Sequence, residues 1–438
     1  MKLLSEPRLE TIEMPENLAV AMMVMQARQQ HAAQGGGALD FVHYAFGGSP
    51  FPVPAAVQQA LGEASGQGEY RPAEGIAPLR EQIGRFWDKH FGMKIDPGRM
   101  VVVPGSKQGI YNTLALLQGP VILPAPSWVG YLPIARLLDK KVIVVPTRAE
   151  DGYRITAEGL DAQCRELEDA PQSFLILNSP NNPTGAVYTR SELEALAAVC
   201  RTHNIIVISD EIYSLITYDA AGFTSMAQIY PEGTFITTGI SKYAGAGGYR
   251  LGVTILPETC TEQQLLNFRK VGAATYTNAA SPVQFAAIAA FGTDPAMDAY
   301  IDAQRNLHRM MTTELARRFG ELPGVTTTTP QGSFYFFANF DARGDELRAK
   351  GIADSRTMAT SLLQEPCRVA MVSGASLLMP PESLTFRIAA VDYDGAAVMK
   401  AYQQARPQGP QAEHAFVAQH AAGLLSGVDR LRSFLDTL

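Results

Sequence analysis

Residues 237–252 read Thr-Thr-Gly-Ile-Ser-Lys-Tyr-Ala-Gly-Ala-Gly-Gly-Tyr-Arg-Leu-Gly. Lys242 follows an apolar run at 235–236 that predicts a strand, and Arg250 comes shortly after it in a glycine-rich loop. A lysine in such a loop can lose solvation, which lowers its pKa and makes the amine a nucleophile toward carbonyl carbon. The glycines let backbone approach an anion, which the arginine can bind with two parallel hydrogen bonds. Taken alone, the stretch also fits an ordinary surface loop.

Length and composition limit the classes of protein. A chain of 438 residues exceeds the size at which one core keeps growing, which predicts two domains. The net charge of −7 argues against a nucleic-acid binder, and no apolar run approaches the roughly 20 residues of a membrane span. The first six residues are too short an apolar segment for a secretory signal. Four scattered cysteines without a C-x-x-C pair predict reduced thiols in a cytoplasmic protein, and no metal site.

From about residue 54, short apolar strands alternate with helices. The predicted strands are 100–103, 121–123, 141–145, 174–177, 205–209, 234–238 and 252–256. Wholly apolar strands separated by helices, such as those predicted at 107–118 and 190–203, indicate a parallel or mixed sheet buried on both faces. We therefore expect an α/β fold, with a large domain at 54–300 in which helices sandwich a mostly parallel seven-stranded sheet.

The two ends of the chain predict a smaller α+β domain. Residues 1–53 form an N-terminal arm, in which Asn17 could cap a helix rich in good helix formers. Residues 301–438 form the C-terminal part, after a long helical stretch at about 282–320. The further elements predicted there are strands at 334–337, 369–372 and 385–389 and a final helix at about 412–436.

Polar residues follow several of the predicted strands directly. Strand 100–103 leads into Ser106 and Lys107 at the start of a helix, where backbone N–H groups bind phosphate well. Strand 174–177 leads into Asn182, and strand 205–209 leads into Asp210 and Tyr213. The carboxyl ends of parallel strands meet at one edge of a sheet, so we expect these groups to face Lys242 across one ligand site.

Three motifs in this order resemble the class I and II aminotransferases, which are fold-type-I pyridoxal-phosphate enzymes of the aspartate aminotransferase superfamily. They are Asn-Pro-Thr-Gly at 182–185, Asp-Glu-Ile-Tyr at 210–213, and Ser-Lys at 241–242 with Gly-Tyr-Arg-Leu-Gly at 248–252. The similarity extends from about residue 40 to 390. It implies an aminotransferase that uses pyridoxal 5'-phosphate to move an amino group between an L-amino acid and a 2-oxo acid by a ping-pong mechanism.

The resemblance also implies which residues hold the cofactor. Lys242 would form a Schiff base with its aldehyde and then move the substrate Cα proton, while Asp210 would keep the pyridine nitrogen protonated. Asn182 and Tyr213 would hydrogen-bond the phenolate oxygen, and Trp128 would stack on the ring. The phosphate would be bound by Ser106, Lys107, Ser241, Arg250 and Tyr70 of the partner subunit. The last of these implies a homodimer with shared active sites.

Substrate binding is implied in the same way. Arg387 would bind the α-carboxylate through a planar, bidentate contact, with Gly48 and Asn182 beside it. Many relatives have a serine three residues before the lysine, where this chain has Gly239. One phosphate ligand is therefore missing or is supplied by Thr238.

The choice of amino donor stays open. Lys107 and Trp128 resemble one branch of aspartate aminotransferases, in which the lysine meets the distal carboxylate of the substrate. Where that branch has small hydroxylic residues this chain has Glu16, which would repel an acidic side chain and suit a cationic or polar one. The loop at 372–376 also departs from the Pro-Gly-x-x-Phe pattern of that branch.

Three other functions compete with transamination. A pyridoxal-phosphate β-lyase, synthase, cyclase or oxidase would share every cofactor contact, so the motifs do not separate them. A sensor domain of a transcription regulator would need a DNA-binding module, and the residues before the motifs are too few and too poor in basic side chains. A dinucleotide enzyme is disfavoured because Arg250 stands where G-x-G-x-x-G requires its last glycine.

Overall fold

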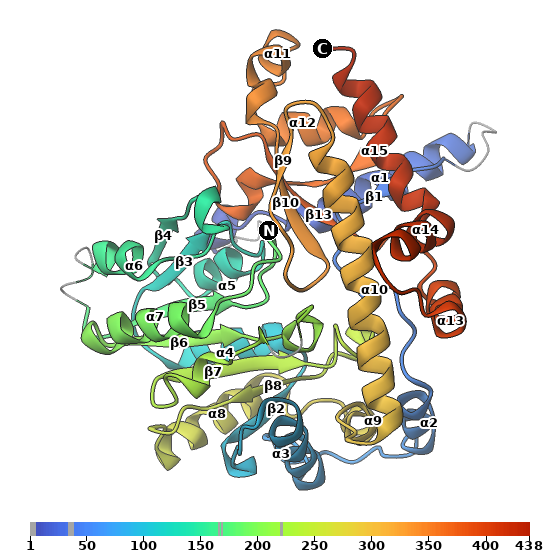
Figure 1. Ribbon diagram of the computed structural model, residues 1–438. Coiled ribbons are helices and arrows are strands. Elements are labelled where there is room, and N and C mark those ends of the chain that lie inside the picture. The colour runs from blue at the N-terminus through green and yellow to red at the C-terminus, as the bar shows by residue number, and fades with distance from the viewer. Residues whose placement is uncertain (1–5, 34–38, 165–166, 168–169, 220–221) are drawn as a thin grey trace, which may run out of the picture.

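A computed structural model describes residues 6–33, 39–164, 167, 170–219 and 222–438 (Figure 1). Residues 1–5, which carry most of the segment examined for a secretory signal, lie outside the described ranges. Among the helices of these ranges, none has the length and apolar character needed to cross a membrane. All four cysteines are free thiols, and Cys164 and Cys200 pack in the same apolar cluster.

Seven strands form the central sheet, in the order β2-β8-β7-β6-β5-β3-β4. Their bounds are β2 Met100–Val103, β3 Val121–Ala125, β4 Val142–Pro146, β5 Ser173–Asn178, β6 Ile205–Asp210, β7 Thr234–Gly239 and β8 Gly252–Ile255. Only β8 runs antiparallel to its neighbours, and the other adjacent strands are parallel. The prediction of a mostly parallel seven-stranded sheet is confirmed.

Helices cover both faces of this sheet, which explains why its strands are almost wholly apolar. On β5, Leu175 belongs to a core cluster with α6 and α7, whereas its neighbour Phe174 packs with α4 and α5 on the opposite face. The helices are α2 Ala55–Glu63, α3 Ala77–Phe91, α4 Ser106–Leu116, α5 Tyr131–Leu137, α6 Ala157–Cys164, α7 Arg190–Thr202, α8 Glu262–Thr275 and α9 Ser281–Ala290.

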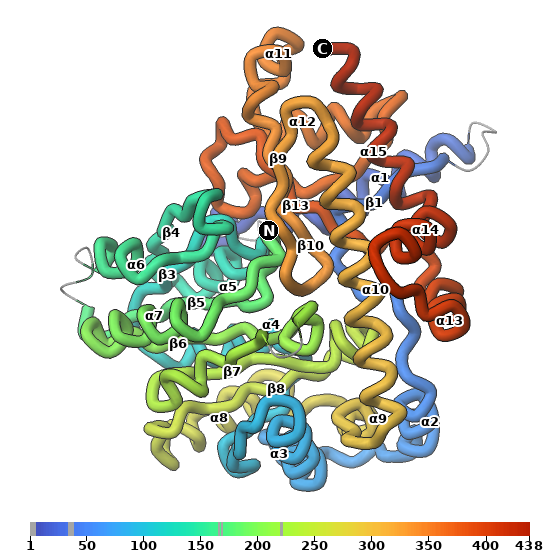
Figure 2. Tube along the Cα trace, in the orientation of Figure 1, coloured from blue at the N-terminus to red at the C-terminus, as the bar shows by residue number. Residues whose placement is uncertain are grey.

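The long helical stretch predicted at about 282–320 consists of two helices, α9 and α10 (Pro295–Gly320). The Asp294 carboxylate accepts hydrogen bonds from the backbone N–H groups of Ala296 and Met297, so an Asp-Pro pair starts a new helix. Met297 packs in the core of the large sheet, whereas the later part of α10 packs in the second core. As Figures 1 and 2 show, α10 therefore bridges the two parts of the chain, and the predicted boundary at residue 300 falls inside it.

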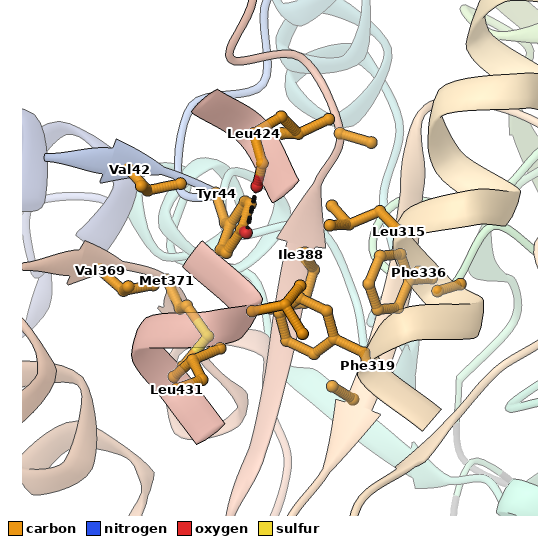
Figure 3. Close-up of a cluster of buried hydrophobic side chains, with 14 of the residues drawn as sticks. Val42, Tyr44, Leu315, Phe319, Phe336, Val369, Met371, Ile388, Leu424 and Leu431 are labelled. Carbon is orange, nitrogen blue, oxygen red and sulfur yellow. Dashed lines mark hydrogen bonds between the residues drawn. The ribbon is translucent and has the colours of Figure 1, made fainter. Parts of the chain in front are cut away.

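The second core unites the two ends of the chain. A four-stranded sheet, β12-β13-β10-β9, lies beside the two-stranded pair β1-β11. In Figure 3, the Tyr44 hydroxyl donates a hydrogen bond of 2.5 Å to the carbonyl oxygen of Leu424, which joins the N-terminal segment to the last helix. The strands are β1 Val42–His43, β9 Thr326–Thr327, β10 Tyr335–Asn339, β11 Val369–Ala370, β12 Val372–Ser373 and β13 Thr385–Ala389.

Helices complete this part of the molecule. They are α1 Glu16–Ala33, α11 Gly344–Ala349, α12 Ser355–Leu362, α13 Gly395–Ala405, α14 Pro410–His420 and α15 Ala422–Leu435. The single final helix predicted at about 412–436 is wrong, because the chain breaks at Ala421 between α14 and α15. The prediction that Asn17 caps the first helix is also wrong, since α1 begins at Glu16.

Candidate active site

A cavity of about 460 Å³ lies at the carboxyl ends of β5, β6 and β7. Eleven residues proposed from the sequence line it: Gly48, Ser106, Lys107, Trp128, Asn182, Asp210, Tyr213, Ser241, Lys242, Arg250 and Arg387. Tyr70 does not line this cavity, and its side chain is 86% exposed. The structure thus brings together every site residue proposed from the sequence except Tyr70. The individual roles of these residues stay predictions.

Lys242 lies in the loop after β7 and faces the cavity. Its Nζ donates a hydrogen bond of 2.6 Å to the carbonyl oxygen of Gly47 and lies 5.6 Å from the ring centre of Tyr213. Burial lowers the pKa of this amine to about 8, and the positive charge of Arg387 acts in the same direction, whereas Asp210 opposes it. A considerable fraction of the amine is therefore neutral near physiological pH and able to attack a carbonyl carbon.

Asp210, the last residue of β6, is buried and lines the same cavity. The Tyr131 hydroxyl donates to its Oδ2 at 2.7 Å, and the backbone N–H of Ile212 donates to its Oδ1 at 3.3 Å. Burial raises the pKa of Asp210 to about 6, although these hydrogen bonds and Lys242 lower it. The carboxylate is therefore mostly ionised at neutral pH and can hold a proton on a ring nitrogen.

The start of α4 and Arg250 lie together on another wall of the cavity and carry groups that suit an anion. The first backbone N–H groups of a helix have no partner within it, and the helix dipole attracts negative charge there. Gly105 has φ +88°, and a Cβ at this position would lie 2.2 Å from Nη2 of Arg250. Only a glycine therefore allows the guanidinium to approach the first turn of α4. Ser241 lines the same cavity and adds a hydroxyl group.

The missing serine before the lysine has a steric cause. Gly239 of β7 pairs with Gly252 of β8, and a Cβ on Gly239 would lie 2.6 Å from the carbonyl oxygen of Leu251. Position 239 therefore has no room for a side chain unless the backbone moves. Thr238 is buried and does not line the cavity, whereas the Thr237 hydroxyl donates to the carbonyl oxygen of Ser106 at 3.3 Å.

Arg387 on β13 is 1% exposed and lines the cavity. Its Nη1 donates to Oδ1 of Asn182 at 3.3 Å, and its Nη2 donates to the carbonyl oxygen of Ala45 at 2.6 Å. Its Nε is buried without a hydrogen-bond partner, and no carboxylate pairs with the guanidinium in the described part of the chain. A buried cation of this kind is stabilised by a planar anion such as a carboxylate.

Two tyrosines of the site were not predicted. The hydroxyl of Tyr335, on β10, shares a hydrogen bond of 3.2 Å with the Tyr213 hydroxyl. The Arg387 guanidinium lies over the Tyr335 ring, 4.8 Å from the ring centre. Its sequence signal was a single hydroxyl within the aromatic run at 334–337. Tyr131 stands three residues after Trp128 and opens α5, yet nothing local shows that it reaches Asp210.

Asn178 was also not predicted as a site residue. Its side chain holds the loop that carries Asn182. Its Nδ2 donates to the backbone carbonyl of Asp210 at 2.8 Å, and its Oδ1 accepts from the backbone N–H of Asn182 at 2.7 Å. Asn178 therefore links the ends of β5 and β6. Trp128 packs edge-on against Tyr131, with ring centres 5.1 Å apart, and the Lys107 amine lies 5.0 Å from the Trp128 ring centre.

Glu16 was expected beside the substrate pocket, but it does not line the cavity. Its Oε2 accepts hydrogen bonds from the backbone N–H of Ser373 at 2.8 Å and from the Ser373 hydroxyl at 2.7 Å. The negative charge expected beside the substrate is therefore directed to β12 instead. The next residue, Asn17, lines the cavity in its place.

The chain is similar to known proteins over most of its length. The family model described as aminotransferase class I and II matches residues 40–397, more than half of the chain. An aspartate aminotransferase of Geobacillus stearothermophilus is 30% identical over 353 residues, which cover 78% of this chain and 85% of that protein. An asparagine–oxo-acid transaminase of Streptococcus mutans is 28% identical over 84% of this chain and 91% of its own length. A solved aspartate aminotransferase from Thermus thermophilus, with maleate, has a TM-score of 0.81 at 25% identity, covering 99% of this chain and 100% of that one.

Proposed function

Since the chain belongs to the class I and II aminotransferase family, we propose that it moves an amino group between an L-amino acid and a 2-oxo acid by a ping-pong mechanism, with pyridoxal 5'-phosphate held on Lys242. The observation that carries the proposal is the pairing of two perturbed groups in one cavity. Lys242 has an amine of lowered pKa, and Asp210 has a buried carboxylate fixed by Tyr131.

The donor set of the cavity fits this cofactor. The first turn of α4 with Arg250 and Ser241 suits the phosphate, since Gly105 leaves room for the guanidinium. Asp210 suits the pyridine nitrogen, and Lys242 suits the aldehyde carbon, to which it would attach as a Schiff base. The remaining polar groups near the ring position are Asn182 and Tyr213, which suit the phenolate oxygen, while Trp128 would cover the ring face.

Each residue then has a defined task in transamination. Bound pyridoxal phosphate supplies an aldehyde that receives the amino group and a ring that withdraws electrons. Arg387, with Gly48 and Asn182 beside it, would hold the substrate α-carboxylate and so fix the direction of the Cα–H bond. Lys242, once released by the incoming amine, would remove the proton from Cα. Asp210 would keep a proton on the ring nitrogen throughout.

We further propose a homodimer in which Tyr70 reaches the phosphate of the neighbouring site. Its support is exposure, because an aromatic side chain that is 86% exposed suits an interface better than a free surface. Leu18, Met22 and Met25 are also exposed, at spacings that place them on one face of α1. The four free thiols favour a cytoplasmic location.

A half-reaction experiment tests the function. The purified protein, loaded with pyridoxal phosphate, is mixed with single amino acids while the absorbance of the lysine-bound cofactor is followed. A transaminase loses this band and recovers it only when a 2-oxo acid is added. Recovery without an oxo acid would instead indicate a β-lyase, synthase, cyclase or oxidase. The relatives above are named for both aspartate and asparagine, so their names leave the donor open.

A further inference from the structure

Two aromatic rings lie beside the amine of Lys242. Its Nζ atom is 5.6 Å from the ring centre of Tyr213 and 5.7 Å from the ring centre of Phe334. The two rings are nearly perpendicular, with an angle of 85° between their planes and 5.5 Å between their centres. The amine therefore lies in the corner between the two rings, within the distance at which the face of an aromatic ring attracts a cation.

Phe334 has no part in the cofactor and substrate contacts proposed above. It directly precedes β10, is fully buried and does not line the cavity. Its backbone carbonyl oxygen accepts a hydrogen bond of 2.9 Å from the N–H of Ala390. Its ring packs against the imidazole of His308 on α10, with ring centres 4.9 Å apart. Phe334 is therefore held in place, and it can act on the reaction through Lys242 without touching the substrate.

The protonated form of Lys242 has few groups that stabilise it. Burial disfavours the ammonium, and so do three nearby cations, Arg387, Arg250 and Lys107. Asp210 is the charged neighbour that favours it. The face of a buried aromatic ring also stabilises a cation, and it brings no charge and no basic atom that could compete for the proton.

The groups packed around the Phe334 ring stay uncharged. Both ring nitrogens of His308 are buried and have no hydrogen-bond partner among the described residues. Burial lowers the pKa of His308 to about 3, and the charge of Lys242 acts in the same direction. Burial also raises the pKa of the Tyr213 and Tyr335 hydroxyls. None of these side chains therefore gains or loses a proton when Lys242 titrates.

We propose that Phe334 is a positioning residue whose ring stabilises the ammonium that Lys242 becomes when it takes the substrate proton. In that step the Cα–H bond breaks, its electron pair stays with the substrate carbon, and an N–H bond forms on Nζ. The ring lowers the free energy of the cation and keeps Nζ in its place beside the cavity. This inference rests on the proposed transaminase function and adds a residue to its proton transfer.

The first experiment measures the pKa of Lys242 in the full chain without cofactor. The protein is labelled with a trace of acetic anhydride at a series of pH values, and the label on Lys242 is quantified by peptide mass spectrometry. Phe334→Leu keeps an apolar side chain but removes the ring face. The midpoint of labelling should therefore lie about 0.5–1.5 pH units lower than in the wild type.

Phe336→Leu is the matched control. Phe336 is as buried as Phe334 and lies two residues further along the chain, but it packs against Phe319 in the second core (Figure 3). The same substitution there should lower the stability of the protein and leave the midpoint of Lys242 labelling at the wild-type value.

The sign of the shift separates this role from a general effect on packing. Looser packing would admit water to Lys242, weaken the effect of burial and raise its pKa toward the ordinary value of a lysine. Loss of the ring face lowers the pKa instead. A midpoint in Phe334→Leu that equals or exceeds that of the wild type would therefore overturn the inference.

The second experiment follows the half-reaction with the amino acid that reacts fastest with the wild type. Phe334→Leu should lower the limiting rate constant about 3–30-fold, which corresponds to the expected pKa shift, and leave the half-saturating concentration within about twofold. Borohydride trapping on Lys242 is measured for each protein. A wild type that traps no cofactor would overturn the proposed function and the inference with it. If the cofactor is trapped and Phe334→Leu reacts at the wild-type rate, only the inference fails.

Discussion

The Nζ of Lys242 donates a hydrogen bond of 2.6 Å to the carbonyl oxygen of Gly47. The two residues are 195 positions apart in the chain, and the bond connects the loop after β7 to the segment that follows β1. Tyr335 donates to the same carbonyl at 3.3 Å, which ties β10 to this point. Through the Gly47 carbonyl, the Lys242 amine of the large domain is thus connected to the N-terminal segment and to β10.

Replacement of Lys242 by alanine should abolish covalent attachment of the cofactor. The purified variant should lack the absorbance band of the lysine-bound form, and borohydride should leave no adduct detectable by peptide mass spectrometry. Lys242→Arg is the matched control, because it keeps a positive charge but offers no nucleophilic amine. A stable adduct in either variant would show that another lysine is the attachment site.

The pH dependence of cofactor attachment should reveal the lowered pKa of Lys242. Because only the neutral amine attacks the aldehyde, the attachment rate of apoprotein should rise with pH, with a midpoint near 8 rather than near 10.5, the ordinary pKa of a lysine side chain. Arg387→Gln removes a positive charge that lowers this pKa, so the midpoint should move to higher pH. Stopped-flow absorbance at a series of pH values measures the midpoint for the wild type and for Arg387→Gln. An unchanged midpoint in the variant would show that the Arg387 charge does not lower the pKa of Lys242.

Tyr131→Phe should alter the titration of Asp210. In the wild type, the hydrogen bond from Tyr131 lowers the pKa of the buried Asp210 carboxyl. Without this bond, the pKa should rise above about 6. The acidic limb of the pH–rate profile should then move to higher pH. The variant should also lose about 1.5–3 kcal/mol of stability, as is usual for a hydrogen bond to a charged group. Tyr402→Phe, on a partly exposed face of α13, is the control for general effects of removing a hydroxyl.

Gly239→Ser, which restores the residue common in relatives, should damage this protein. The new Cβ would lie 2.6 Å from the Leu251 carbonyl oxygen and 2.8 Å from Cα of Gly252, so β7 and β8 would have to separate. Overpacking of this kind costs about 1–3 kcal/mol. Thermal unfolding should show a lower Tm than for Gly248→Ser, because a Cβ at position 248 meets nothing within 4 Å. A more stable Gly239→Ser protein would refute the steric explanation.

A shared site predicts complementation between two inactive variants. Tyr70→Ala should weaken phosphate binding, and Lys242→Ala should remove the attachment site. If Tyr70 serves the neighbouring subunit, a mixed dimer contains one site with both residues intact. Activity should therefore reappear when the two variants are unfolded together and refolded as a mixture. Absence of any recovery, although mixed dimers form, would place Tyr70 outside the site.

The sequence predicted the large sheet and the groups at its edge well, for a local reason. Strands buried on both faces must be apolar along their whole length, and the residues that follow a parallel strand must lie at its carboxyl edge. Asp210, Asn182 and Lys242 could therefore be assigned to one cavity before their distances were known. The break between α9 and α10 was missed although Gly292 and the Asp294–Pro295 pair are local signals of a helix end and of a new helix start.

What the sequence by itself determined is the family, the sheet and the chemistry at the strand ends, because these follow from patterns within short segments. Only the tertiary structure decided which of two neighbouring residues lines the cavity and which bonds to another part of the fold. Glu16 bonds to Ser373 while Asn17 lines the cavity, because the first turn of α1 docks on β12. Packing of distant segments also explains why position 239 has no room for a side chain. The same is true of the hydrogen bond between Lys242 and the Gly47 carbonyl. Such contacts leave no periodic signal in either segment alone.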